Sequence, residues 1–184
     1  SWLRKMLYYK GMGEIMELKD TIRAIEDYPK EGVIFRDITT LLKDKDAFKK
    51  AVDDMAEKID PDVDKIIGIE ARGFIFGAAL AYKLNKGFIP VRKPGKLPWD
   101  KLSESYDLEY GEDSIEIHED AIEEGEKIVI VDDLLATGGT SKACLKLVES
   151  LKGEVLSLVF LAELEDLKGR EVLEGEKVYS VIKY

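Results

Sequence analysis

The residues most suited to chemistry stand in one short run, from Ile128 to Thr140. Four β-branched residues come first, and the adjacent carboxylates Asp132 and Asp133 follow them. A turn of small residues, Ala136 to Thr140, then leads directly into a predicted helix. Small residues let a backbone approach a phosphate closely, and amides at the start of a helix donate hydrogen bonds to its oxygens. The spacing matches neither GxxxxGK[ST] nor GxGxxG, so the turn predicts a phosphate cradle that is neither a P-loop nor a dinucleotide fingerprint.

The acid pair narrows the choice of ligand. Asp132 and Asp133 would repel a bare phosphate, so they must face groups that donate hydrogen bonds or carry positive charge. Ribose hydroxyls and a hydrated magnesium ion meet that need, and the run therefore indicates a ribose phosphate. The alternative is that the carboxylates only cap the strand and the glycines only make a turn. The β-branched residues before the pair and the helix after the turn favour the binding site.

The elements that must position this run alternate along the chain. Strands are predicted at 65–69, 87–91, 128–131 and 154–161, and helices at 18–25, 44–59, 74–84 and after the Gly-rich turn. This alternation is typical of βαβ units, which predicts an α/β fold with a mostly parallel central sheet and helices on both faces. Such folds bind ligands at the carboxyl ends of their strands. The periodic pattern is lost between Pro94 and Gly111, a length typical of a lid or binding loop.

Composition bounds the class of protein. The 184 residues carry a net charge of −10, which disfavours nucleic acid and anionic membrane surfaces as partners. No apolar run approaches the ~20 residues that span a bilayer. One cysteine and one histidine exclude an internal disulfide and the usual zinc sites, so we expect a reducing, cytoplasmic location. We expect a single domain over residues 16–184 and interpret residues 1–15 as an N-terminal extension or leader remnant.

The motif VIVDDLLATGGT resembles the 5-phosphoribosyl 1-pyrophosphate (PRPP) binding motif of type I phosphoribosyltransferases, in its adenine phosphoribosyltransferase form. The resemblance runs from about Leu18 to the C-terminus. Further blocks carry it in the family's order: YPKEGVIFRDITTLL at 28–42, IGIEARGFIFGAALA at 67–81, IPVRKPGKLP at 89–98, YDLEYG at 106–111 and LAELEDLKGRE at 161–171. It implies a phosphoribosyltransferase-like sheet with a small N-terminal hood and a mobile lid loop.

The resemblance implies a pentosyl transfer of purine salvage, in which adenine and PRPP give AMP and pyrophosphate. Magnesium would be held by substrate and water near Asp132, with no direct protein ligand. The acid pair would accept hydrogen bonds from the ribose hydroxyls, and the 5-phosphate would lie on Ala136, Thr137, Gly138, Gly139 and Thr140. Pyrophosphate would be held by Arg72, Arg92, Lys93, Lys96 and Tyr110, with a cis peptide expected at Glu70–Ala71. Solvated surface charge is the alternative for each basic residue.

The base site and the catalytic group also follow from the resemblance. Main-chain groups of Ile34 and Arg36 would read the adenine edge, the Phe35 ring would stack on the base, and Leu164 would pack beside it. Plain core packing is the alternative for Phe35 and Leu164. Glu109, in the lid, would assist proton movement on the base, and its alternative is a surface carboxylate at a strand edge.

Two other functions stay open beside adenine transfer. One is transfer to another nucleobase, which the VIFRDIT block disfavours because it lines the base site in the adenine family. The other is a PRPP-binding regulator without catalysis; such a regulator needs a DNA-reading domain, which we do not expect in this acidic chain. The resemblance also suggests a homodimer.

Overall fold

The computed structural model describes residues 16–108 and 110–184. The predicted N-terminal extension, residues 1–15, lies outside the described residues. The chain divides into two compact units, of which the first reaches to Lys50 and the second runs from Ala51 to Tyr184. No helix in the described part combines the length and the apolar composition that crossing a bilayer requires.

The first unit contains a short antiparallel hairpin and two small helical turns. A 3-10 turn, η1 (Leu18–Thr21), precedes strand β1 (Arg23–Ile25), which pairs with β2 (Phe35–Asp37). Helix α2 (Thr39–Leu42) follows, and α3 (Lys45–Ala56) begins in this unit. The helix predicted at 18–25 is wrong in its second half, because Arg23–Ile25 extends to pair with β2.

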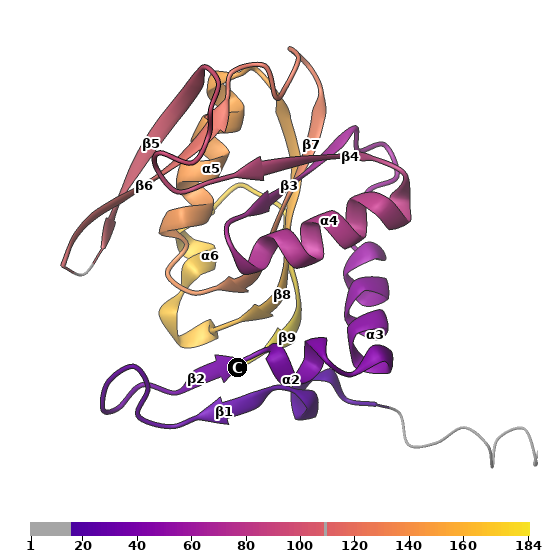
Figure 1. Ribbon diagram of the computed structural model, residues 1–184, viewed down its shortest axis with the longest axis vertical. Coiled ribbons are helices and arrows are strands. Elements are labelled where there is room, and N and C mark those ends of the chain that lie inside the picture. Colours follow the sequence, from indigo (N-terminus) through magenta and orange to yellow (C-terminus); the bar gives the residue numbers. More distant parts are fainter. Residues whose placement is uncertain (1–15, 109) are drawn as a thin grey trace, which may run out of the picture. The chain divides into compact units, whose positions relative to one another are not determined.

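The second unit is built on one five-stranded sheet in which every pairing is parallel, in the order β4-β3-β7-β8-β9 (Figure 1). The strands are β3 (Lys65–Ile69), β4 (Gly87–Val91), β7 (Lys127–Leu135), β8 (Glu154–Glu163) and β9 (Val178–Lys183). Near-continuous apolar runs fit a parallel sheet because both of its faces are covered. The predicted α/β fold with a mostly parallel sheet is confirmed.

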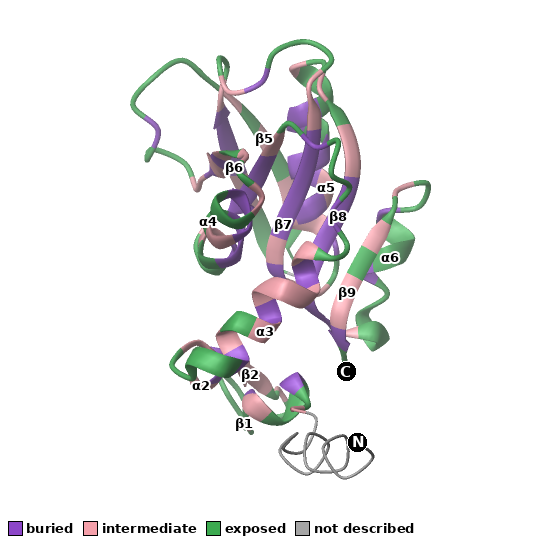
Figure 2. Cartoon of the chain, turned by 90° about the vertical axis from the view of Figure 1, so that its right-hand side faces the viewer, coloured by how far each residue is buried: buried purple, intermediate pink, exposed green. Residues whose placement is uncertain are grey.

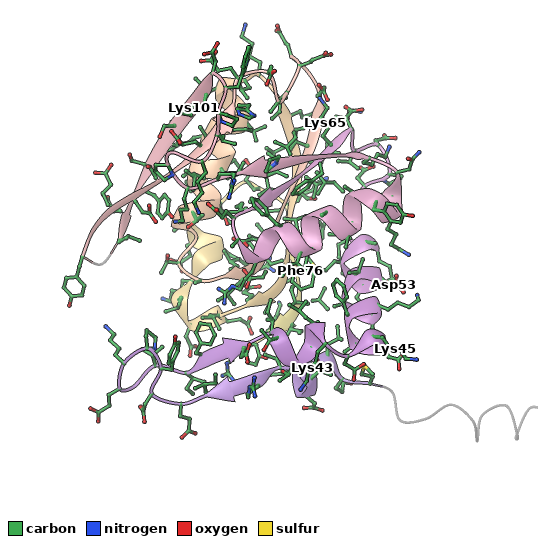
Figure 3. All side chains as sticks on the ribbon, viewed as in Figure 1. Lys43, Lys45, Asp53, Lys65, Phe76 and Lys101 are labelled. Atoms are coloured by element: carbon green, nitrogen blue, oxygen red, sulfur yellow. The ribbon has the colours of Figure 1, made fainter. Side chains whose placement is uncertain are left out.

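Helices α4 (Arg72–Leu84) and α5 (Gly139–Ser150) lie on opposite faces of this sheet. Figure 2 shows the buried core as the purple lengths of β7, β8 and α5. On the other face, α4 buries Phe76 (Figure 3) and approaches β3 backbone to backbone. A Cβ on Gly77 would lie 3.0 Å from Gly68 Cα, so this contact leaves no room for a side chain on Gly77. The turns η2 (Glu165–Leu167) and α6 (Gly169–Val172) connect β8 to β9.

The segment expected to be an irregular loop is instead largely a β-hairpin. Strands β5 (Lys101–Leu108) and β6 (Gly111–His118) pair along their whole length, so the predicted loss of structure between Pro94 and Gly111 is wrong beyond Asp100. The hairpin is anchored because Ile115 and Ile117 are buried in the same core as α5. Strand β5 of this hairpin alternates between half-buried and exposed residues, a pattern of period two.

The order of the strands places the loops after β3 and β7 side by side at one edge of the sheet. The chain moves from β3 to β4 in one direction and from β7 to β8 in the other, so the two loops diverge at a topological switch point, where open α/β sheets bind ligands. Strand β7 is also longer than predicted. Leu134 and Leu135 pair with Ala162 and Glu163 of β8, so the acid pair lies inside the strand and not after it.

Candidate active site

A cavity of about 270 Å³ lies where these two loops diverge. Its lining comes from the end of β3 and the start of α4 on one side and from β7 and the following loop on the other. A second hollow of about 70 Å³ is enclosed by the loop itself. Residues that the sequence predicted for PRPP line the larger cavity: Arg72, Lys93, Asp132, Asp133, Ala136 and Thr140.

The acid pair is held in a definite arrangement. Asp133 is 6% exposed, and its Oδ2 lies 2.9 Å from Arg72 Nε. Oδ1 of Asp132 accepts a hydrogen bond from the Asp133 amide at 2.8 Å. Burial, together with the neighbouring charge of Asp133, raises the pKa of Asp132 well above its usual value. Hydroxyl donors or positive charge brought by a ligand would stabilise the charged form of this carboxyl group.

The turn expected to cradle a phosphate leads directly into helix α5. Gly138 has φ +87°, a left-handed conformation that favours glycine, and α5 starts at the next residue. The first amides of a helix have no partner within the helix, so those of Gly139 and Thr140 are available to a bound anion. The residues from Ala136 to Thr140 surround the smaller hollow.

Two of the cationic side chains expected for pyrophosphate, those of Arg92 and Lys96, contact a carboxylate that the sequence did not single out, that of Glu70. Glu70 Oε1 lies 2.8 Å from Arg92 Nη2 and 2.5 Å from Lys96 Nζ, and Oε2 accepts from the Lys93 amide at 2.6 Å. Partial burial acts to raise the pKa of Glu70, but the hydrogen bonds from Lys96, the Lys93 amide and Arg92 lower it to about 2. The Glu70–Ala71 peptide is cis, as the resemblance implies.

Lys93 has a carboxylate partner of its own. Its Nζ forms an ion pair with Asp113 and a 2.9 Å hydrogen bond with the Tyr106 hydroxyl, both on the hairpin. Arg92, Lys93 and Lys96 therefore each have a carboxylate partner in the fold. Tyr110, also expected near pyrophosphate, is 84% exposed.

The residues expected for adenine lie in both units. Phe35 and Arg36 are in β2 and Ile34 precedes it, all in the first unit. The Phe35 ring packs edge-on against Tyr28, with ring centres 5.3 Å apart. Leu164 belongs to the second unit, where its amide donates to the Leu135 carbonyl at 2.9 Å. Glu109, the expected catalytic residue, lies outside the described residues.

Sequence reasoning missed several residues of the site. Glu70, Tyr106 and Asp113 hold the cations, and Gly73 lies against the acid pair: a Cβ there would be 2.8 Å from Asp132 Oδ1. The period-two pattern of residues 101–108 was available as a signal for the hairpin, and hence for Tyr106. No one-dimensional pattern pairs Glu70 with Lys96, because 26 positions separate them.

The contact of Gly73 leads to a testable expectation. Gly73→Ala forces α4 and β7 apart, and overpacking of this kind costs about 1–3 kcal/mol. We expect PRPP affinity to fall about 10-fold, since 1.4 kcal/mol is one decade in a dissociation constant. Calorimetric titration measures it. Gly87→Ala is the control, because its methyl meets only the flexible Lys65 side chain, 3.2 Å away at Cγ. Equal PRPP affinity in both variants would show that Asp132 tolerates the displacement.

The sheet order, the acid pair at the switch point and the cradle beside it define a class of protein, the phosphoribosyltransferases. The family model described as the phosphoribosyl transferase domain matches residues 39–183.

Individual relatives narrow the family. The chain is 61% identical over 169 residues to the adenine phosphoribosyltransferase of Halothermothrix orenii, an alignment that covers 91% of this chain and 99% of the relative. The crystal structure of adenine phosphoribosyltransferase from Thermoanaerobacter pseudethanolicus matches with a TM-score of 0.88 and 55% identity, over 91% and 98% of the two chains. The Saccharomyces cerevisiae enzyme, solved with adenine and an imino-altritol bisphosphate, matches with a TM-score of 0.82 and 38% identity, over 89% and 95%. The chain belongs to the adenine phosphoribosyltransferase family.

Proposed function

We propose that the protein transfers the 5-phosphoribosyl group of PRPP to adenine, giving AMP and pyrophosphate in purine salvage. One observation carries the proposal: the cavity at the switch point is lined by Asp132 and Asp133 and also by Arg72. Groups suited to ribose hydroxyls and a group suited to an anion therefore face one space. The names of the relatives support adenine as the acceptor.

In this proposal three sets of residues bind the three parts of PRPP. Asp132 and Asp133 accept hydrogen bonds from the ribose hydroxyls, and the amides from Ala136 to Thr140 hold the 5-phosphate. The pyrophosphate takes Arg72, Arg92, Lys93, Lys96 and Tyr110. Because Glu70 already binds Arg92 and Lys96, pyrophosphate must share these cations with Glu70 or take them from it.

Magnesium fits this site as a companion of the substrate. Within residues 16–108 and 110–184, no three His, Cys, Asp or Glu side chains gather closely enough to hold a metal ion by themselves. The acid pair would contact the ion's water shell near Asp132, and PRPP would supply oxygen ligands. When bound, Mg²⁺ would offset the negative charge that builds up on the departing pyrophosphate.

The chain's own residues would support a cationic, oxocarbenium-like ribose as the bond to pyrophosphate breaks. In this proposal the acid pair stabilises that charge, and Glu109 moves a proton on the base. Main-chain groups of Ile34 and Arg36 read the adenine edge, the Phe35 ring stacks on the base, and Leu164 packs beside it. Stacking of a base on an aromatic ring is worth about 1–3 kcal/mol in nucleic-acid complexes, which gives the Phe35 ring a substantial part in affinity.

We further propose that the protein acts as a homodimer in the cytoplasm. One side of α4 supports the dimer: Ile75, Ala78 and Tyr82 share a helical face, and Tyr82 is 91% exposed. Sedimentation equilibrium should give twice the chain mass of 20.8 kDa.

The thiol of Cys144 supports the proposed compartment. It is buried, and burial raises its pKa; a free thiol of this kind fits a reducing compartment.

The decisive experiment offers the protein PRPP and Mg²⁺ with adenine, hypoxanthine, guanine, xanthine or uracil, one base at a time. We expect AMP from adenine and no nucleotide from the others, as resolved by liquid chromatography. A nucleotide from another base would move the protein to a different transferase activity. PRPP binding without any nucleotide would identify a regulator.

A further inference from the structure

A nearly buried carboxylate outside the substrate cavity holds an unusually complete set of partners. Glu163, the last residue of β8, is 3% exposed. Arg170 donates to both of its oxygens, from Nε to Oε2 at 2.8 Å and from Nη2 to Oε1 at 3.0 Å. The Ser180 hydroxyl donates to Oε1 at 2.6 Å. Burial acts to raise the pKa of Glu163, but these hydrogen bonds outweigh it and lower the pKa. The carboxylate is therefore charged and fixed in place.

Arg170 uses its third guanidinium nitrogen to reach the neighbouring strand. Its Nη1 donates to the Val178 carbonyl of β9 at 2.8 Å. The guanidinium thus joins α6, where Arg170 lies, to the last residue of β8 and the first residue of β9. A helix of four residues has little stability of its own, so contacts of this kind determine where α6 sits.

The residue before Arg170 lies directly against the phosphate cradle. A Cβ on Gly169 would be 2.5 Å from the Ala136 carbonyl oxygen, and a Cβ on Gly138 would be 2.8 Å from the Gly169 carbonyl oxygen. The two backbones therefore touch with no side chain between them. Any movement of α6 is transmitted to the loop from Ala136 to Gly138.

We propose that Arg170 is a positioning residue for the phosphoribosyl site, because its bidentate ion pair with Glu163 holds Gly169 against the cradle. The cradle amides then point to the 5-phosphate before substrate arrives. This inference rests on the proposed function, which assigns the cradle to that phosphate. Preorganisation of this kind acts on the binding of PRPP more than on the chemistry that follows.

The test replaces Arg170 with methionine and with lysine and measures kcat, the KM for PRPP and the calorimetric Kd of PRPP with Mg²⁺. Misplacement of binding groups by about 1 Å can cost up to ~10²-fold, and we expect the Kd and KM for PRPP to rise about 10-fold with kcat changed less than about 2-fold. Arg170→Lys keeps the charge but loses the planar fork, so it should resemble Arg170→Met more than the wild type.

Lys65→Met is the matched control. It removes another ion pair of this unit, Lys65 Nζ to Glu126 Oε1 at 2.8 Å, at the start of β3 (Figure 3). We expect it to lower the melting temperature without changing the KM for PRPP. If the Arg170 variants also lose only melting temperature, the pair is merely structural and the proposal is overturned.

Two further variants keep the proposal testable if Arg170→Met does not fold or if the proposed function is wrong. If Arg170→Met does not fold, the double variant Glu163→Gln/Arg170→Met removes both charges together and avoids an uncompensated buried carboxylate. A wild-type Kd for PRPP in the folded double variant overturns the positioning role. Asp132→Asn/Asp133→Asn tests the proposed function itself: unchanged PRPP affinity there contradicts the proposed PRPP site, whereas weakened affinity combined with normal Arg170 variants contradicts only this inference.

Discussion

Replacing Asp132 and Asp133 together with asparagine should remove measurable PRPP binding while the protein stays folded. Hydrogen bonds to a charged acceptor contribute about 1.5–3 kcal/mol each, so the loss of two costs about 3 kcal/mol or more. That corresponds to a Kd raised ~10²-fold or more. Calorimetric titration of PRPP with Mg²⁺ measures it, with circular dichroism as the check on folding. Unchanged affinity in the double variant would mean that the carboxylates are structural caps.

The single variants should differ in stability, and their difference tests the geometry of the pair. Asp133→Asn breaks the ion pair with Arg72 and should lower the melting temperature. Asp132 has a raised pKa, so its contribution to stability is present below its unfolded pKa and lost as the pH rises through its folded pKa. At neutral pH, Asp132→Asn should therefore keep or raise the melting temperature without ligand. A large decrease for Asp132→Asn would show that its charged form stabilises the fold.

Glu109→Ala should lower kcat ~10²-fold or more, the low end of general acid–base contributions, with PRPP affinity little changed. The expectation rests on the resemblance, which assigns Glu109 to the lid; Tyr106 and Asp113, close to it along the chain, hold Lys93, which lines the cavity. Steady-state kinetics and PRPP titration separate the two effects. Glu112→Ala, an exposed carboxylate three residues away, is the control and should leave kcat unchanged.

The same hairpin should act as a gate. An oxocarbenium-like ribose that is open to solvent reacts with water, so the transfer to adenine requires water to be excluded first. We therefore expect backbone amides of β5 and β6 to exchange faster without ligand than with PRPP and a nonreactive adenine analogue. Strong protection that is equal in both states would mean a fixed hairpin, and the gating role would have to be abandoned.

The fold followed closely from local patterns where those patterns were strong. The strands at 65–69 and 87–91 have their predicted bounds, because short apolar runs between turn signals admit one interpretation inside a βαβ chain. The predictions failed where pairing partners decide the structure. Arg23–Ile25 became a strand because Phe35–Asp37 lies opposite, and the segment from Lys101 to His118 became a hairpin for the same reason. Strand pairing is a non-local interaction that local periodicity does not encode.

The site shows the same difference between what local sequence patterns predict and what non-local contacts decide. The sequence by itself determined the acid pair, the Gly-rich cradle and their order along the chain, because the chemistry of a ribose phosphate requires contiguous groups and a tight turn. Only the tertiary structure decided which distant groups meet them. It brought Glu70 to Arg92 and Lys96, Gly73 to Asp132, and Gly169, the neighbour of Arg170, to the loop at Ala136. The physical reason is the parallel sheet, which gathers at one edge loops that are separated by whole βαβ units.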